Sequence, residues 1–375
     1  MQHWGRRVAV VVLGDLGRSP RMQYHAVRLA EAGSEIDLIG IAGTAPIAEI
    51  GDNPNIRIHL LVAPTEQLHR SRWATIVGGV SQLLQQTAQL WRVLGRIAAP
   101  QTILVQTPPA LPTLAIAWLA ARRRGAQLVI DWHNFSHAVL AQKLGAAGRQ
   151  PWPVAALQRL ELTLGRLADR HLCVSMAMAA ELQRLAGIAA EVMHDRPGPG
   201  LMPLPHEERL QVRRDLLALP PAEPSFVAIT STSWTFDEDL DLLLDAAQQL
   251  DRRFAATLPR RALTIVITGD GPRRAAFEQR LAATALKQIR LRTMWLAWDD
   301  YRRLLAAADA GISLHRSASG VDLPMKIQDM LGAGLPVLAL DYGDCLREVL
   351  RPGENGELFR TAAELAAILA RLADS

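Results

Sequence analysis

A lysine between two apolar segments is the first candidate for chemistry. The sequence there reads Pro324-Met-Lys326-Ile-Gln-Asp329. A proline in the first turn of a helix loses no hydrogen bond, so the free backbone N–H groups can face a phosphate. Lys326 adds a positive charge beside them, and Asp329 lies one turn further on, where its carboxylate can accept from ribose hydroxyls. The spacing predicts a sugar-nucleotide site.

The lysine is unusual for this chain. Of 41 lysines and arginines only three are lysines, Lys143, Lys287 and Lys326. A compact ammonium therefore stands at a predicted helix start where this sequence would ordinarily use a guanidinium. The alternative interpretation is a solvated surface lysine with no ligand.

A second candidate follows the first apolar segment of the chain. Gly14 and Gly17 allow the backbone to approach a ligand closely. Arg18 and Arg21, at the start of the next predicted helix, can bind an anionic group through their planar guanidinium groups. Asp15, between the glycines, is either a candidate general base or the local cap of a solvated turn.

Asp131 and His133 come directly after another apolar segment. Titratable groups at the end of a parallel strand lie at the mouth of a ligand site, so both are candidate general bases. A purely structural Asp–His hydrogen bond is the alternative.

The second half of the chain carries three further loops. Ser231, Thr232, Ser233 and Trp234 offer hydroxyl and N–H donors for a diphosphate, and the acids that follow could equally match a helix dipole. Gly269 and Gly271 form a turn into a helix. Trp295 ends the next strand, where it can either flank a nucleobase or pack in the core.

Strand and helix patterns alternate through both halves, which predicts an α/β fold with two doubly wound parallel sheets. Strands are expected at 8–13, 35–41, 56–62, 102–106, 127–132, 171–175, 191–194, 226–232, 263–268, 289–295, 311–315 and 337–341. The expected domains are 1–196 and 225–360, joined by a proline-rich linker at 197–224 and followed by a helix at 361–375 that a capping box at Thr361 begins. Such folds bind ligands at the carboxyl ends of their strands.

Composition narrows the class of protein. A chain of 375 residues with 49% hydrophobic and 21% charged residues is ordinary for a globular protein. A net charge of +4 suits acidic ligands, and no nucleic-acid-binding motif appears. Cys173 and Cys345 have no metal or redox spacing, which fits a reducing compartment. The first turn lacks the Gly-x-Gly-x-x-Gly spacing of a nicotinamide enzyme.

Several motifs together resemble one family. They are Gly14-Asp-Leu-Gly-Arg-Ser-Pro-Arg-Met-Gln-Tyr-His25, Gln106-Thr-Pro-Pro, Asp131-Trp-His-Asn, Ser231-Thr-Ser-Trp-Thr, Gly269-Asp-Gly-Pro and Ser319-Gly-Val-Asp-Leu-Pro-Met-Lys-Ile-Gln-Asp-Met. In this order they resemble the chitobiosyldiphosphodolichol β-mannosyltransferases, inverting glycosyltransferases with the GT-B fold.

The resemblance implies that mannose passes from GDP-mannose to a lipid-diphosphate-linked N-acetylglucosamine acceptor, forming a β-1,4 linkage. It adds Asp322, Leu323, Pro324 and Met325 to the donor site, and His25 and Gln106 to the acceptor site. It also implies a cytoplasmic location and a final helix that packs on the first domain. Family members usually begin with a membrane-spanning helix, whereas the apolar run here is only about six residues long.

The segment Leu68–Ala98 offers a different way to reach a membrane. It contains no acid and carries four arginines, with Trp73 and Trp91 near its ends. Such a basic amphipathic helix can lie on an anionic membrane surface as a peripheral anchor. An ordinary helix covering the first sheet would show the same pattern.

The expected reaction is direct displacement. A base at Asp131 or His133, or less favourably Asp15, takes a proton from the acceptor hydroxyl, and Lys326 stabilises the leaving diphosphate. No cofactor or metal is expected, because no carboxylate cluster or His/Cys set has ligand spacing. The alternatives are a UDP-sugar transferase, a sugar-nucleotide epimerase and a non-enzymatic sugar-nucleotide-binding protein.

Overall fold

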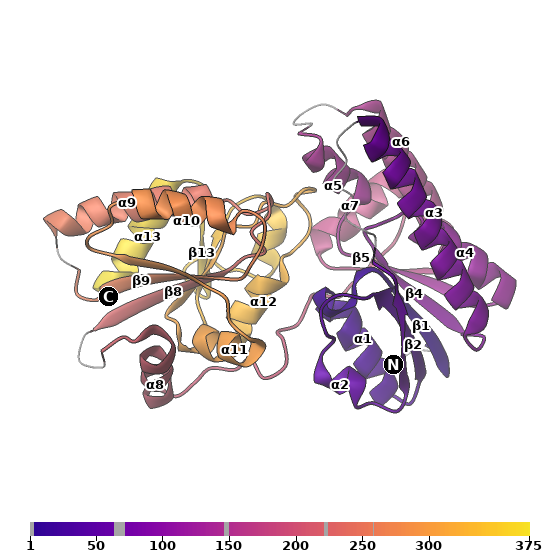
Figure 1. Ribbon diagram of the computed structural model, residues 1–375, viewed down its shortest axis with the longest axis horizontal. Helices are drawn as coiled ribbons and strands as arrows, with labels where there is room; N and C mark the ends of the chain where they lie inside the picture. The colour runs from indigo at the N-terminus through magenta and orange to yellow at the C-terminus, as the bar shows by residue number, and fades with distance from the viewer. Residues whose placement is uncertain (1–3, 64–71, 146–149, 221–223, 258) are drawn as a thin grey trace. The chain divides into compact units, whose positions relative to one another are not determined.

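The protein consists of two compact units, Met1–His194 and Asp195–Ser375. The computed structural model describes residues 4–63, 72–145, 150–220, 224–257 and 259–375, with the backbone but not the side chains of 72–80. Figure 1 colours unit 1 from indigo to magenta and unit 2 from rose to yellow.

Unit 1 is built on a seven-stranded parallel sheet in the order β3-β2-β1-β4-β5-β6-β7. Its strands are β1 (Arg7–Asp15), β2 (Glu35–Ile41), β3 (Ile56–Leu61), β4 (Thr102–Thr107), β5 (Gln127–Trp132), β6 (Arg170–Cys173) and β7 (Glu191–Val192). Its helices are η1 (Leu16–Arg18), α1 (Pro20–Glu31), α2 (Ala48–Gly51), α3 (Arg72–Arg96), α4 (Thr113–Arg124), α5 (Ser136–Lys143), α6 (Trp152–Gly165) and α7 (Met176–Ala186).

Unit 2 is built on a six-stranded sheet in the order β10-β9-β8-β11-β12-β13, in which every pairing is parallel. Its strands are β8 (Ser225–Ser231), β9 (Ala262–Thr268), β10 (Arg290–Met294), β11 (Ala310–Ser313), β12 (Val337–Leu340) and β13 (Gly356–Phe359). Its helices are α8 (His206–Leu217), α9 (Leu240–Ala256), α10 (Arg274–Ala283), α11 (Trp298–Ala307), α12 (Met325–Gly332), η2 (Asp344–Glu348) and α13 (Ala362–Asp374).

In both sheets, the loops that carry the candidate site residues follow the carboxyl ends of the strands. The central strands β1, β4, β8 and β9 are almost wholly buried and apolar, because helices cover both faces of a parallel sheet. In each sheet the polar residues come where these strands end, and strands that run parallel end on the same side. The predicted alternation of strands is confirmed, apart from β13, which sequence reasoning missed.

The final helix packs within unit 2. Its capping box at Thr361 is present as expected, and α13 packs on α9. Leu365, Leu369 and Ala373 lie on one helix face and join the core of unit 2 with Phe254 and Phe226. The apolar stripe of α13 is therefore already covered inside its own unit.

The proline-rich stretch at 197–224 also belongs to unit 2. Pro197 contacts Gly332 and Pro203 contacts Gly334, at the end of α12. The helix α8 within it packs on α11, and Arg209 and Arg213 of α8 bind Asp309 ahead of β11. The division between units falls at 194–195, close to the predicted end of the first domain at 196. Beyond it, the stretch expected to link two domains forms a layer of unit 2.

Candidate functional site

Lys326 lies in the first turn of α12, and Pro324 is the residue that precedes the helix. Its ammonium donates to the carbonyl of Ser231 at 2.7 Å and forms an ion pair with Glu238. Burial lowers the pKa of Lys326 to about 8, against the opposing effect of the nearby Asp237 charge. The lysine is therefore held against the end of β8 and the loop that follows it.

Glu238 is a functional candidate that sequence reasoning missed. Its carboxylate is 3% exposed and accepts from the Thr232 hydroxyl and from the Ser233 N–H at 3.2 Å. It therefore joins the 231–233 loop to Lys326. The sequence shows only one acid among several after Trp234, and the contact with Lys326 spans 88 positions.

The glycine turn after β9 is explained by close contact between two loops. A Cβ at Gly269 would lie 1.9 Å from the carbonyl oxygen of Thr232, and a Cβ at Gly271 would lie 2.0 Å from that of Ser233. Gly269 also has φ +127°. The glycines thus let the 269–271 turn support the loop at 231–234 directly.

Asp329 has a partner within unit 2. Its Oδ1 accepts from the backbone N–H of Gly198 at 2.8 Å. Burial raises the pKa of Asp329 to about 6, the charge of Asp195 acts in the same direction, and the Gly198 hydrogen bond opposes both. One carboxylate oxygen therefore holds the backbone at Gly198, whereas the sequence predicted that Asp329 binds ribose hydroxyls.

Asp322 belongs to a second buried charge network. His315 lies 3.2 Å from Asp322 and 3.6 Å from Asp237. Burial alone would lower the pKa of His315, but these two carboxylates outweigh it and raise the pKa to about 9. Asp322 also accepts from Ser319 and Ser317. It therefore organises the loop ahead of α12, where Leu323 is buried and Pro324 and Met325 are half-buried.

The two tryptophans of the predicted donor site differ in exposure to solvent. Trp234 is fully buried with φ +56°, and its ring packs on Phe277. Trp295 is 65% exposed, so it is not a core residue. The exposed ring after β10 is the one available to a ligand.

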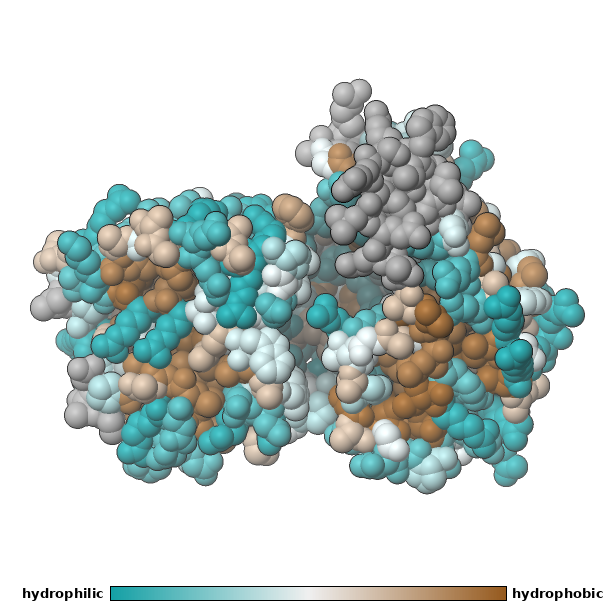
Figure 2. All heavy atoms as spheres, in the orientation of Figure 1, coloured by the Kyte–Doolittle hydropathy of each residue, from teal (hydrophilic) through white to brown (hydrophobic). Residues whose placement is uncertain are grey.

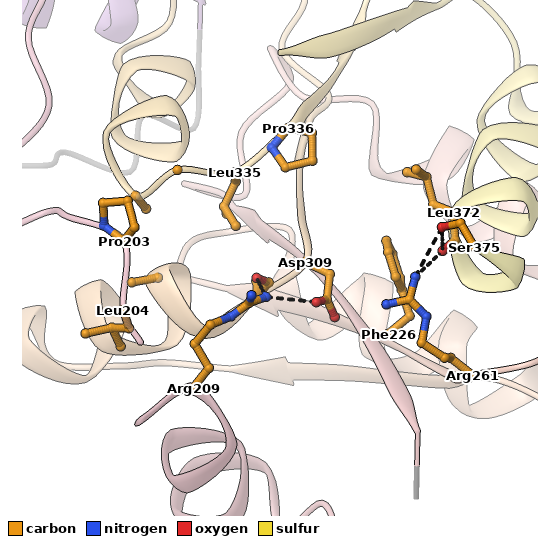
Figure 3. Close-up of a pocket in the computed structure, with 14 residues that line it drawn as sticks. Pro203, Leu204, Arg209, Phe226, Arg261, Asp309, Leu335, Pro336, Leu372 and Ser375 are labelled. Carbon is orange, nitrogen blue, oxygen red and sulfur yellow. Dashed lines mark hydrogen bonds and ion pairs between the residues drawn. The ribbon is translucent and has the colours of Figure 1, made fainter. Parts of the chain in front are cut away.

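A separate pocket of about 320 Å³ lies at the opposite edge of this sheet (Figure 3). Phe226, Arg261, Asp309 and Pro336 line it, next to the starts of their strands. Arg209 binds Asp309 there, and Arg261 donates to Leu372 and Ser375. These arginines join elements of unit 2, and none of the predicted donor residues lines the pocket.

Asp131 is the centre of the unit 1 site. Its side chain is 0% exposed and receives two hydrogen bonds from Arg21, at 2.7 and 3.0 Å. The Nε2 atoms of His25 and His133 lie 3.0 and 3.1 Å from Oδ2 of the same carboxylate. The structure thus brings together two residues of the Gly14–His25 motif, Arg21 and His25, and two of the Asp131 motif.

The carboxylate of Asp131 is kept ionised by its neighbours. Burial alone would raise its pKa, but His133, His25 and Arg21 together keep the pKa well below its usual range. The ionised carboxylate accepts hydrogen bonds, so each histidine presents Nε2–H to it. Asp131 orients the histidines, and the 21%-exposed side chain of His133 remains accessible.

Arg21 has a different position from the one expected for an acceptor-diphosphate ligand. Its side chain is 5% exposed, and Nη1 donates to the carbonyl of Met193 at 2.6 Å. Arg18 in contrast is 73% exposed, with Asp15 as a loose partner at 3.7 Å. Of the two predicted arginines, Arg18 is the one that can meet a ligand.

Asp15 organises its own loop. It accepts from the N–H of Gly17 at 3.1 Å and from the N–H and hydroxyl of Thr44 at 3.0 and 2.8 Å. A Cβ at Gly17 would lie 2.4 Å from the Thr44 carbonyl oxygen, whereas Gly14 has space around it. The local-cap interpretation of Asp15 accounts for these contacts.

Gln106, at the end of β4, has a buried amide oxygen with no hydrogen-bond partner among the described residues.

The described residues contain no group of three or more His, Cys, Asp or Glu side chains that could hold a metal ion. Within the same residues, no helix is long and apolar enough to cross a bilayer.

Comparison with known proteins assigns the chain to a family. The family model described as "Glycosyl transferase 4-like domain" matches residues 17–198, and "Glycosyl transferases group 1" matches 223–375. The chitobiosyldiphosphodolichol beta-mannosyltransferase of Mus musculus is 35% identical, with 98% of this chain and 81% of that protein covered. The chain belongs to this mannosyltransferase family. It is therefore a hexosyltransferase, as the motifs predict.

Other similar proteins agree on the family and the fold. The Yarrowia lipolytica mannosyltransferase is 36% identical over 96% of this chain and 77% of its own. The "UDP-glycosyltransferase TURAN" of Arabidopsis thaliana is 37% identical over 96% and 87%. The crystal structure of the glycosyltransferase WaaG has a TM-score of 0.65 at 12% identity, covering 98% and 90%. The fold of this mannosyltransferase family member is GT-B.

We expect Gly271→Ala to weaken nucleoside-diphosphate binding at least tenfold, because the added methyl group would displace the 231–234 loop. Isothermal titration with GDP and UDP measures this. Gly95→Ala is the control, since no atom lies within 4 Å of its Cβ position. Unchanged binding in Gly271→Ala would show that the two loops need not touch.

We expect Arg21→Ala to lower the free energy of unfolding by about 3–5 kcal/mol, because it leaves a buried carboxylate without its guanidinium partner. Urea denaturation at pH 7 measures the loss. Arg18→Ala, at an exposed site, should cost under about 1 kcal/mol. Equal effects of the two variants would contradict the assignment of Arg21 to the Asp131 cluster.

Proposed function

We propose that the enzyme transfers mannose from GDP-mannose to a lipid-diphosphate-linked di-N-acetylglucosamine and forms a β-1,4 linkage with inversion. The observation that carries the proposal is the oriented Asp131–His133 pair in a chain 35% identical to a named chitobiosyldiphosphodolichol β-mannosyltransferase. Inversion requires a base that removes the acceptor proton, and such a pair supplies one.

The proposed base is His133. Its Nε2–H faces the ionised Asp131, so its Nδ1 lone pair takes the proton of the acceptor hydroxyl. The hydroxyl oxygen forms the new bond to the anomeric carbon as the bond to the diphosphate breaks, and the electron pair leaves with GDP. Asp131 then stabilises the imidazolium.

The proposed donor groups lie in unit 2. Lys326, which the end of β8 holds in place, would stabilise the negative charge that develops on the leaving diphosphate. Asp322 and the first turn of α12 would shape the sugar pocket, and Trp295 would contact the base. This set provides positive charge without a metal, so transfer in the presence of a chelator is part of the proposal.

Membrane contact is proposed for the face of unit 1 that carries α3. Val62, after β3, donates to Gln89 of α3, which joins the strand and the helix. Leu60, Val62 and Leu84 are 58–65% exposed there. Figure 2 shows hydrophobic residues gathered on the visible face of unit 1. Leu68 and Arg70 lie outside the described residues, as do the side chains of Trp73 and its neighbours.

We expect purified enzyme with GDP-mannose and a lipid-diphosphate di-N-acetylglucosamine to form a β-linked trisaccharide, with and without EDTA. Product linkage is read by nuclear magnetic resonance and glycosidase digestion. UDP-glucose and UDP-N-acetylglucosamine are run in parallel, since one similar protein carries a UDP-glycosyltransferase name. An α-linked product, or turnover only with a UDP-sugar, would refute the proposal.

We expect His133→Ala to reduce kcat by about 10²–10⁴, because the acceptor proton loses its base. GDP affinity should stay within twofold, since His133 lies in unit 1 and the donor groups in unit 2. The matched comparison is His59→Ala, another His–Asp pair of unit 1 at 2.7 Å. Equal rates in both variants would remove His133 from the mechanism.

A further inference from the structure

Glu238 and Lys326 form a pair whose geometry leaves one donor unused. An ammonium has three N–H donors. Lys326 gives one to the Ser231 carbonyl and one to Glu238, and no third acceptor of Nζ is recorded among the residues that the structure describes. One partner, Ser231, ends β8 and the other, Glu238, lies in the loop that follows, so the remaining N–H is open to a ligand.

Glu238 is itself held from three sides. The Thr232 hydroxyl and the Ser233 N–H donate to it, and its backbone bridges to His315 beyond β11. It is 3% exposed, so its carboxylate has little freedom to move away from Lys326. A buried carboxylate in this position keeps the adjacent ammonium charged and in place.

We propose that Glu238 is a positioning residue for the donor diphosphate: it keeps Lys326 protonated and aims its unused N–H at the leaving group. The inference rests on the proposed function for the identity of the donor. It adds a residue that acts through Lys326 and does not itself touch the substrate, because its carboxylate is occupied by the loop.

Several other polar groups lie near the pair or its partners and must remain constant in a test. They are Asp237, which acts on the Lys326 charge, His315 with Asp322 beside it, and the Tyr301 hydroxyl, which contacts Ser231 and lies near Asp329. Replacing Glu238 by glutamine leaves all of these in place and removes one charge only. Replacing it by aspartate keeps the charge.

The small number of lysines makes a direct measurement possible. Protein labelled with ¹³C at lysine Cε gives three signals, from Lys143, Lys287 and Lys326. The signal missing in Lys326→Met identifies the third. Burial lowers the pKa of Lys326 to about 8, so its titration falls in an accessible range.

We expect Glu238→Gln to move the Lys326 titration midpoint down by about 1 pH unit or more, because an opposite charge within contact distance is lost. Glu238→Asp should keep the wild-type midpoint, and Glu364→Gln, in the α13 capping box, is the control for folding. An unchanged midpoint in Glu238→Gln would overturn the proposal.

The second measurement is GDP and UDP affinity between pH 6 and pH 9.5. The ammonium is lost as pH rises through the Lys326 pKa, so affinity should fall over that range in the wild type and at lower pH in Glu238→Gln. In Lys326→Met the Glu238 change should have no further effect. Binding curves that superpose, or a wild type that binds neither nucleotide, would overturn the proposal. Nucleotide binding without mannosyl transfer would refute only the proposed function.

Discussion

Compensation of buried charge is the constraint on which both candidate sites depend. Asp131 is fully buried in unit 1, and Lys326 is largely buried in unit 2. A buried charge without a partner is strongly destabilising, so each has recruited its opposite: Arg21 for the carboxylate, Glu238 for the ammonium. In unit 1 the carboxylate that Arg21 holds orients the accessible His133, and in unit 2 Glu238 holds Lys326 directly.

This arrangement follows from the fold. A parallel sheet covered on both faces leaves only its strand ends for polar groups, and all strand ends of one kind meet at one edge. The loops there are held by backbone contact, as between Gly271 and Ser233, and by carboxylates such as Asp15 and Asp322. The predicted residues therefore divide into those that hold the loops and those that solvent can reach, namely the exposed Arg18 and Trp295 and the half-buried His133.

The sequence predicted the strands and their terminal loops well, because apolar strand patterns and glycine or proline punctuation are local signals. It did not predict which side chains pair. Arg21 lies 110 positions from Asp131, and Glu238 lies 88 positions from Lys326, so no local pattern could show either contact. The strand β13 was missed because Glu357 interrupts its apolar residues, so it has no continuous apolar run.

Arg21 connects the Asp131 cluster to the segment where the chain leaves unit 1. The same guanidinium that holds Asp131 also holds the carbonyl of Met193, and the chain leaves unit 1 after the next residue. The last residues of unit 1 and the carboxylate that two histidines share are therefore held by one side chain, so the loss of Arg21 would release both.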